Sequence, residues 1–271
     1  MLLIQNKRLR LLFGALETFS FLTLKLWWKN PDRARNFCGR IFRTYVYLAG
    51  ADKWQSRSID EVLPQVWERR IVLEHTPGDG IDTPIAELGC LALITKNLRP
   101  AMVFEIGTYR GRTALNFALN SPPECKVYTL DLPPAARTQA AKKANPADAA
   151  IIRNADTGLY YRGHELEDKI RQLYGDSMHF DFAPYYGKAD LVFIDGAHHA
   201  EAVRSDTLNA LQMVREGGCV IWHDFGNYGD YNDVTRIVLE LLPRTEIIQI
   251  ENSQLALYRK RGRVTPNAGC R

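Results

Sequence analysis

Hydrophobic residues in this chain fall into short runs that alternate with amphipathic segments from residue 101 onward. Short apolar runs bounded by polar or glycine positions are typical of buried strands. The segment 246–250 is separated from 255–260 by only a short Asn-Ser-Gln turn, so these two should form an antiparallel hairpin at the sheet edge. The predicted strands are 101–106, 126–131, 169–174, 189–195, 219–223, 246–250 and 255–260.

Amphipathic segments lie between these strands, and such alternation is typical of a parallel sheet with helices on both faces. We therefore predict an α/β fold with a doubly wound, mostly parallel, seven-stranded Rossmann-like sheet. Thr83 as N-cap and Pro84 in the first turn predict a helix whose apolar face comes from residues 85–98. Residues 133–165, rich in Ala, Arg and Asp, predict an insertion or lid with some helix.

The chain before residue 79 lacks the alternation of strands and helices that is predicted after residue 101. Residues 1–75 carry few turn signals and are predicted to be helical, and the stretch 76–80 has the composition of a loop. The predicted organisation is an N-terminal helical extension over 1–78, a ligand-binding domain over 79–262 and a tail over 263–271.

The net charge of +4 is unevenly distributed. Residues 1–50 hold nine Lys and Arg against two acids, whereas the rest holds 26 against 29. The body is therefore mildly acidic, which argues against nucleic acid as a partner. Residues 11–28 are mostly apolar but include Glu17 and Lys25, and a bilayer span disfavours central charges. Three interpretations stay open for residues 1–30: packing on the body or on a second subunit as a homodimer, peripheral membrane contact, and a true anchor.

Five cysteines are scattered without a CxxC pair, which is typical of a reducing compartment and argues against a disulfide framework. No small-residue cleavage site of a signal peptide is evident. The expected location is therefore the cytoplasm, with membrane association left open by the N-terminal segment.

A glycine-containing turn follows the strand at 101–106, with the spacing Glu-x-Gly-x-x-x-Gly at Glu105, Gly107 and Gly111. Glycine allows a sharp turn and a close approach of the backbone, and the helix that follows directs free N–H groups to the same place. A dinucleotide site would have a glycine where Glu105 stands. Because an acid favours a cationic ligand over phosphates, the turn suits S-adenosylmethionine (SAM), with its ammonium and sulfonium, better than NAD.

Two further segments are placed to hold the rest of such a cofactor. Asp131 ends the next strand, 24 residues after Gly107, where a carboxylate can accept hydrogen bonds from ribose hydroxyls. Asp176 and Ser177 follow the third strand, where a polar pair can reach an adenine edge, although an ordinary turn is an equal alternative.

Acids and imidazoles gather at the ends of the fourth and fifth strands. Asp195 and His198 follow one, and His223 and Asp224 end the other. The carboxyl ends of neighbouring parallel strands are where open α/β sheets bind ligands. Such residues can act as a base on a hydroxyl, or can bind Mg²⁺ or a transition metal.

With these motifs in order, residues 80–260 resemble class I SAM-dependent methyltransferases. The resemblance is to the group whose fourth strand ends Phe-Ile-Asp-Gly-x-His, here 193–198, and whose fifth ends Gly-Gly-x-x-x-x-His-Asp, here 217–224. This group is similar to cation-dependent O-methyltransferases of catechols and natural-product sugars. His223 stands where the group usually has an acid, and His198 stands where catechol-type enzymes commonly have a lysine.

The resemblance implies methyl transfer from SAM to an oxygen of a small-molecule acceptor. It implies a base at His198 beside Asp195, His223 and Asp224, of which Asp195, His223 and Asp224 would also hold a divalent cation. The implied cofactor-binding residues are Glu105, Gly107, Thr108, Gly111, Asp131, Asp176 and Ser177. Two alternatives remain open: a metal-dependent hydroxylase on the same fold, and a cofactor-binding protein without catalysis.

Overall fold

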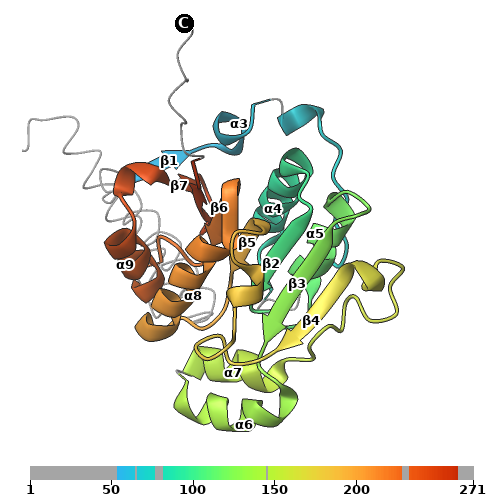
Figure 1. Ribbon diagram of the computed structural model, residues 1–271, viewed down its shortest axis with the longest axis vertical. Helices are drawn as coiled ribbons and strands as arrows, with labels where there is room; N and C mark the ends of the chain where they lie inside the picture. The colour runs from blue at the N-terminus through green and yellow to red at the C-terminus, as the bar shows by residue number, and fades with distance from the viewer. Residues whose placement is uncertain (1–53, 65, 77–81, 145, 228–231, 262–271) are drawn as a thin grey trace, which may run out of the picture. The chain divides into compact units, whose positions relative to one another are not determined.

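The computed structural model describes residues 54–64, 66–76, 82–144, 146–227 and 232–261 (Figure 1). The segment 1–30, with its predicted subunit or membrane contact, and the tail 263–271 lie outside the described residues. Within the described part, no helix is both long and apolar enough to cross a membrane. The strands are β1 (Gln55–Arg57), β2 (Met102–Ile106), β3 (Lys126–Asp131), β4 (Ile170–Tyr174), β5 (Ala189–Ile194), β6 (Val214–Trp222), β7 (Ile247–Ile250) and β8 (Ala256–Arg259).

All eight strands form one sheet in the order β1-β7-β8-β6-β5-β2-β3-β4. Only β8 runs antiparallel to its neighbours, since every other pair is parallel. The predicted fold class is therefore confirmed. The hairpin of β7 and β8 is present, but β1 rather than the hairpin forms the edge of the sheet.

Helices cover both faces of the sheet (Figure 1). The α-helices are α3 (Ile59–Val62), α4 (Ile85–Leu98), α5 (Arg112–Asn120), α6 (Pro134–Lys143), α7 (Pro146–Asn154), α8 (Ala200–Met213) and α9 (Asn232–Leu241). Because side chains alternate along a strand, Val103 and Phe104 enter opposite core clusters. The Phe104 cluster includes residues of α8 and α9, and the Val103 cluster includes residues of α4 and α5.

Two elements differ in detail from the prediction. Helix α4 begins at Ile85 with Pro84 rather than Thr83 at the N-cap, and the Thr83 hydroxyl lies 3.4 Å from that of Thr113. Strand β6 begins at Val214, before the predicted start at residue 219, and its pairing with β5 is irregular between residues 214 and 219. Gly218 is required there because a Cβ would lie 2.6 Å from the Asp190 carbonyl oxygen.

The described part of the segment predicted as an N-terminal extension contributes to the core of the sheet domain. Strand β1 pairs in parallel with β7, and Leu63 and Val66 are buried in the Val103 cluster. Trp54 is 7% exposed and its indole N–H donates to Gln249 Oε1 over 2.7 Å. Residues 54–64 and Val66 therefore belong structurally with the sheet.

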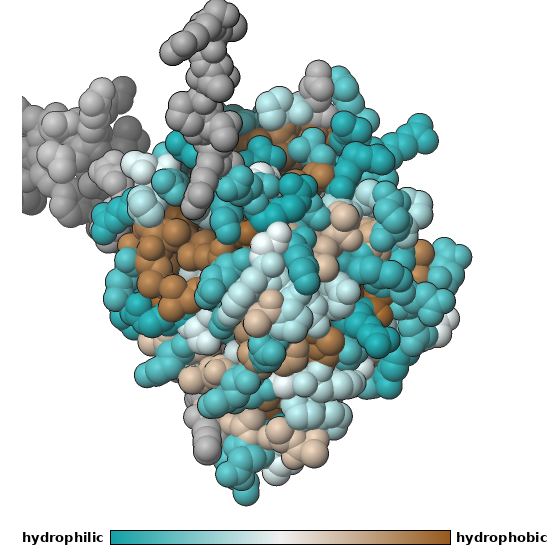
Figure 2. Space-filling model, in the orientation of Figure 1, coloured by the Kyte–Doolittle hydropathy of each residue, from teal (hydrophilic) through white to brown (hydrophobic). Residues whose placement is uncertain are grey.

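Figure 2 shows that the face in this view is mostly hydrophilic, with separate apolar areas. The exposed large hydrophobic residues of the described part lie on several different elements and include Ile85, Leu159, Tyr174 and Leu208.

We expect Trp54→Ala to lower the free energy of unfolding by about 3–5 kcal/mol, the usual cost of truncating a buried tryptophan. Chemical denaturation measures this. Leu208→Ala is the control, because Leu208 is 45% exposed and its truncation should cost less than about 1 kcal/mol. Equal, small losses in the two variants would contradict the assignment of residues 54–64 and Val66 to the core.

Candidate active site

The turn after β2 is formed by close backbone contacts. Gly107 has φ +100°, and a Cβ there would lie 2.0 Å from the Asp195 carbonyl oxygen. Gly111, at φ +82°, is the N-cap of α5 and packs against the Tyr161 ring. A side chain at either position would collide with neighbouring protein atoms, so both glycines are required even without a ligand at the turn.

Glu105, the residue before the last of β2, is 1% exposed. Its Oε2 accepts a hydrogen bond of 2.5 Å from the Thr129 hydroxyl. Burial raises the pKa of Glu105 well above its usual range, Thr129 opposes this, and the nearby Asp195 and Asp131 raise it further. No Lys or Arg of the described residues contributes to that balance, so the carboxyl group lacks a compensating cation.

Thr108 and Asp131 lie beside this turn, as predicted, but their side chains have protein partners. The Thr108 hydroxyl is 2.6 Å from that of Thr129 and accepts from the Gln172 amide. Asp131 accepts backbone N–H groups from Tyr109 on Oδ2 and from Leu132 on Oδ1. Burial raises the pKa of Asp131 and these hydrogen bonds oppose the rise. With a further backbone N–H contact from Thr108, the carboxylate still has lone-pair capacity for a ribose hydroxyl.

The loop after β4 holds Asp176 and Ser177. The Asp176 side chain, half exposed, accepts from the Met178 backbone N–H and lies 3.1 Å from His179 Nδ1. Each of its oxygens thus has one partner within the loop and keeps a lone pair, so its role toward an adenine amine stays a prediction.

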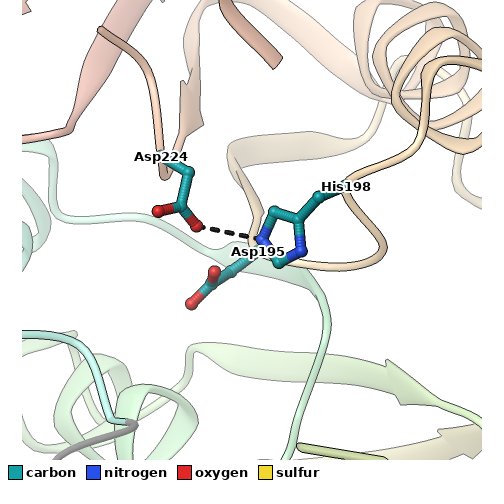
Figure 3. Close-up of side chains that lie close together, drawn as sticks. All are labelled: Asp195, His198 and Asp224. Atoms are coloured by element: carbon teal, nitrogen blue, oxygen red, sulfur yellow. Dashed lines mark hydrogen bonds and ion pairs between the residues drawn. The ribbon is translucent and has the colours of Figure 1, made fainter. Parts of the chain in front are cut away.

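Asp195, His198, His223 and Asp224, which the sequence placed at neighbouring strand ends, do lie together. His198 Nε2 is 2.9 Å from Asp224 Oδ2, and Figure 3 shows this contact beside Asp195. His223 Nδ1 is 3.0 Å from Asp224 Oδ2 and 3.2 Å from Asp195 Oδ1. The strand-end cluster is thus a connected set of carboxylates and imidazoles.

Two acids outside the predicted motifs complete this cluster. Asp148 of α7 lies 2.8 Å from His198 Nδ1, and Glu87 of α4 lies 2.8 Å from His223 Nε2. Glu87 also accepts the Gln254 backbone N–H over 2.7 Å. No sequence motif marks an acid within a helix as the partner of a histidine. Asp148 falls within the predicted insertion, and Glu87 lies in the first turn of the predicted helix.

Both imidazoles are cationic at neutral pH, because each ring nitrogen faces a carboxylate and must donate. Burial lowers the pKa of His198, but the hydrogen bonds to Asp148 and Asp224 outweigh it and raise the pKa to about 10. The pKa of His223 is likewise well above its ordinary value, through Asp195 and Asp224. The two imidazolium ions in turn lower the pKa of Asp224 despite its burial.

The cluster has the donor set of a metal site. One ligand atom each from Asp195, His198 and Asp224 lies within 4.8 Å of the others, among the residues that the structure describes. Two carboxylates and an imidazole suit a transition metal better than Mg²⁺. The set differs from the predicted Asp195, His223 and Asp224, because His198 takes the place of His223.

Comparison with known proteins gives one family. The family described as methyltransferase domain matches residues 104–225, which span β2 to the residue after Asp224. This match confirms the predicted resemblance to methyltransferases. No curated protein sequence matches the chain significantly.

Several solved structures align with most of this chain. A Streptomyces achromogenes O-methyltransferase of tomaymycin synthesis, in complex with SAM, is 15% identical over 81% of this chain and 96% of that one, with a TM-score of 0.45. A methyltransferase from Podospora anserina, bound to S-adenosylhomocysteine, is 14% identical over 84% and 96%, with a TM-score of 0.48. An O-methyltransferase from Bacillus cereus is 16% identical over 79% and 95%, with a TM-score of 0.44.

We expect the contribution of His198 to stability to fall at alkaline pH. Its pKa of about 10 in the folded chain exceeds the ordinary value of 6.5, so the contribution is full below about pH 6.5 and is lost as pH rises through 10. Urea unfolding of wild type and His198→Gln, with chelator present, should show a difference that shrinks from acid to alkaline pH. A constant difference would contradict the cationic assignment.

Proposed function

We propose that this chain, whose residues 104–225 match a methyltransferase domain, transfers a methyl group from SAM to an oxygen of a small molecule. The observation that carries the proposal is the buried Glu105, with Asp131 and Asp195 near it and no compensating cation among the described residues. A ligand with an ammonium and a sulfonium would supply the missing positive charge.

The residues present fit such a ligand. Glu105 would hold the ammonium, and Asp131 would receive the ribose hydroxyls on its free lone pairs. The turn at Gly107, Thr108 and Gly111 would lie against the methionine part, and the loop with Asp176 and Ser177 would lie at the adenine. When bound, SAM supplies an electrophilic methyl group on sulfur. The protein contributes chiefly by holding donor and acceptor in line.

The strand-end cluster would orient the acceptor hydroxyl and take its proton. His198 is predicted from the sequence as the base, but as an imidazolium it has no free lone pair at neutral pH. Asp195 is the most exposed member, at 25%, so we assign the proton-accepting role to its carboxylate. His198 and His223 then hold Asp224 and Asp195 in place. Asp195 would accept the proton of the acceptor hydroxyl, while SAM would supply the methyl group by breaking its sulfur–methyl bond and would leave as the neutral thioether S-adenosylhomocysteine.

A divalent cation at Asp195, His198 and Asp224 would have to displace the proton of a His198 ring nitrogen, and it would then add polarisation of the acceptor oxygen. No observation at the site specifically supports a metal-dependent hydroxylase or a cofactor-binding protein without catalysis. SAM binding with formation of S-adenosylhomocysteine separates the proposal from both of them.

We expect Glu105→Ala and Asp131→Ala each to weaken SAM binding about tenfold or more, because each removes a charge-assisted or paired hydrogen bond at a buried site. Isothermal titration calorimetry measures the affinities. Glu124→Ala, which removes an exposed acid before β3, should leave the affinity unchanged. Unchanged affinity in both site variants would refute the cofactor assignment.

We expect Asp195→Asn to bind SAM nearly normally but to lower the rate of S-adenosylhomocysteine formation about 10²–10⁴-fold, the usual contribution of a positioned base. Asp148→Asn should lower the rate less, because it acts through His198. The assay uses the first acceptor found among catechols and sugars, with Asp156→Asn as an exposed control. Rates unaffected by Asp195→Asn would place the chemistry elsewhere. Activity that survives chelation would remove the metal and leave the carboxylate role standing.

A further inference from the structure

A groove of about 660 Å³ lies at the amino edge of the sheet, opposite the edge that carries Asp195 and Asp224. Three of its lining segments place it there: residue 217 precedes the regular part of β6, residues 245–246 precede β7, and residues 260–261 follow the antiparallel strand β8. Asp195 and Asp224 instead follow the carboxyl ends of β5 and β6. The groove is therefore separate from the proposed active site.

The floor of the groove is apolar and belongs to one face of the sheet. Gln55, Ile248 and Leu257 are neighbours in register across β1, β7 and β8, so their side chains point to the same face. Leu257 packs in the Val103 cluster, which includes residues of α4 and α5, so the groove lies on the face that these helices cover. Arg57 and Arg259 come two residues later in their strands and therefore share this face.

Positive charge lines the groove without acidic partners. Arg57, Arg259 and Arg261 are exposed lining residues, and none of them forms an ion pair with an acid of the described residues. Arg57 Nη2 donates to the neutral amide oxygen of Gln55 over 2.9 Å. Glu246 is the one acid among the lining residues that the structure describes. Such a concentration of guanidinium groups without ion pairs favours an anionic ligand.

The chain enters and leaves the described part through strands of this groove, and its sequence beyond both points is basic. Residues 1–50, which lead to β1, hold nine Lys and Arg against two acids, and residues 262–271, which follow β8, hold two Arg and no acid. The segment 11–28 is also mostly apolar. Basic residues and an apolar segment together supply the two contributions that stable attachment to an anionic lipid surface requires. Nucleic acid is less suited, because the chain after residue 50 holds 26 Lys and Arg against 29 acids.

We propose that this basic groove binds the phosphate headgroups of an anionic phospholipid membrane. Arginine suits this role because its planar guanidinium group binds two phosphate oxygens at once. A groove of this size admits a headgroup, whose glycerol part would pack on Ile248 and Leu257. Because the groove and Asp195 lie at opposite edges of the sheet, a membrane-bound chain would keep the proposed active site directed away from the lipid. The inference does not depend on the methyltransferase activity.

Vesicle flotation of the full chain tests the proposal. The chain should bind vesicles that contain phosphatidylglycerol but not vesicles of phosphatidylcholine alone, and binding should weaken as salt rises. The combined change Arg57→Gln, Arg259→Gln and Arg261→Gln should lower the partition coefficient at least about tenfold, since each basic residue at such a surface contributes roughly fivefold. Lys260 is kept, because its ammonium group already donates to the Val214 carbonyl oxygen over 2.7 Å.

A matched variant separates the groove from the net charge. Lys142→Gln, Arg153→Gln and Arg162→Gln remove the same charge from exposed positions of the α6–α7 insertion and the turn after it, outside the groove. This variant should lower the partition coefficient less than about threefold, because charges more than a Debye length from the lipid are screened. Thermal unfolding of both triple variants should match wild type, since all six side chains are exposed.

Each other outcome overturns the inference. Wild type that ignores phosphatidylglycerol, or binds both kinds of vesicle equally, has no anionic lipid site. Equal losses in the two triple variants would show that net charge alone attracts the chain, and an unchanged groove variant would assign lipid binding to residues outside the groove. If duplex DNA or inorganic phosphate binds through the three groove arginines while vesicles do not bind, the groove serves a different anion.

Discussion

The site depends on one chain of alternating carboxylates and imidazolium ions, from Asp148 through His198, Asp224 and His223 to Glu87. It links α7, the loops after β5 and β6, and α4. Every ring nitrogen in it faces an acid, so each charge is compensated only while its neighbours stay in place. Breaking a buried pair by removing one member leaves an uncompensated charge, which is strongly destabilising. The network therefore fixes the strand ends relative to two helices that are distant in sequence.

The sheet could largely be predicted from the sequence because its central strands are continuous apolar runs. Strand β5, buried over its whole length, is the clearest case. Strand β1 could not be predicted, because its three residues, Gln-Ser-Arg, carry no apolar pattern and pair with a strand about 190 residues away. The extra length of β6 was hidden by Gly217 and Gly218, which are typical of a turn but here accommodate an irregular strand.

For the site, the sequence predicted the residues that follow directly after the parallel strands. Asp195 and Asp224 meet because parallel strands end at the same edge of the sheet. Glu87 and Asp148 lie in helices, and which helical acid faces a histidine depends on packing that the spacing of residues does not reveal. The charge of His198 was also beyond sequence reasoning, because it follows from the two carboxylates on its ring. That contact changes the proposed role of the residue from a base to a support for Asp224.

Gly107 packs directly on the backbone of Asp195, and Asp195 N–H donates to the Ile106 carbonyl over 2.8 Å. The turn that would hold the methyl donor and the Asp195 loop that would hold the acceptor are thus in direct main-chain contact. Their separation does not depend on side-chain identity elsewhere. The α6–α7 insertion, apart from Asp148, can therefore vary in evolution or in the laboratory while the main-chain spacing between the two halves stays constant.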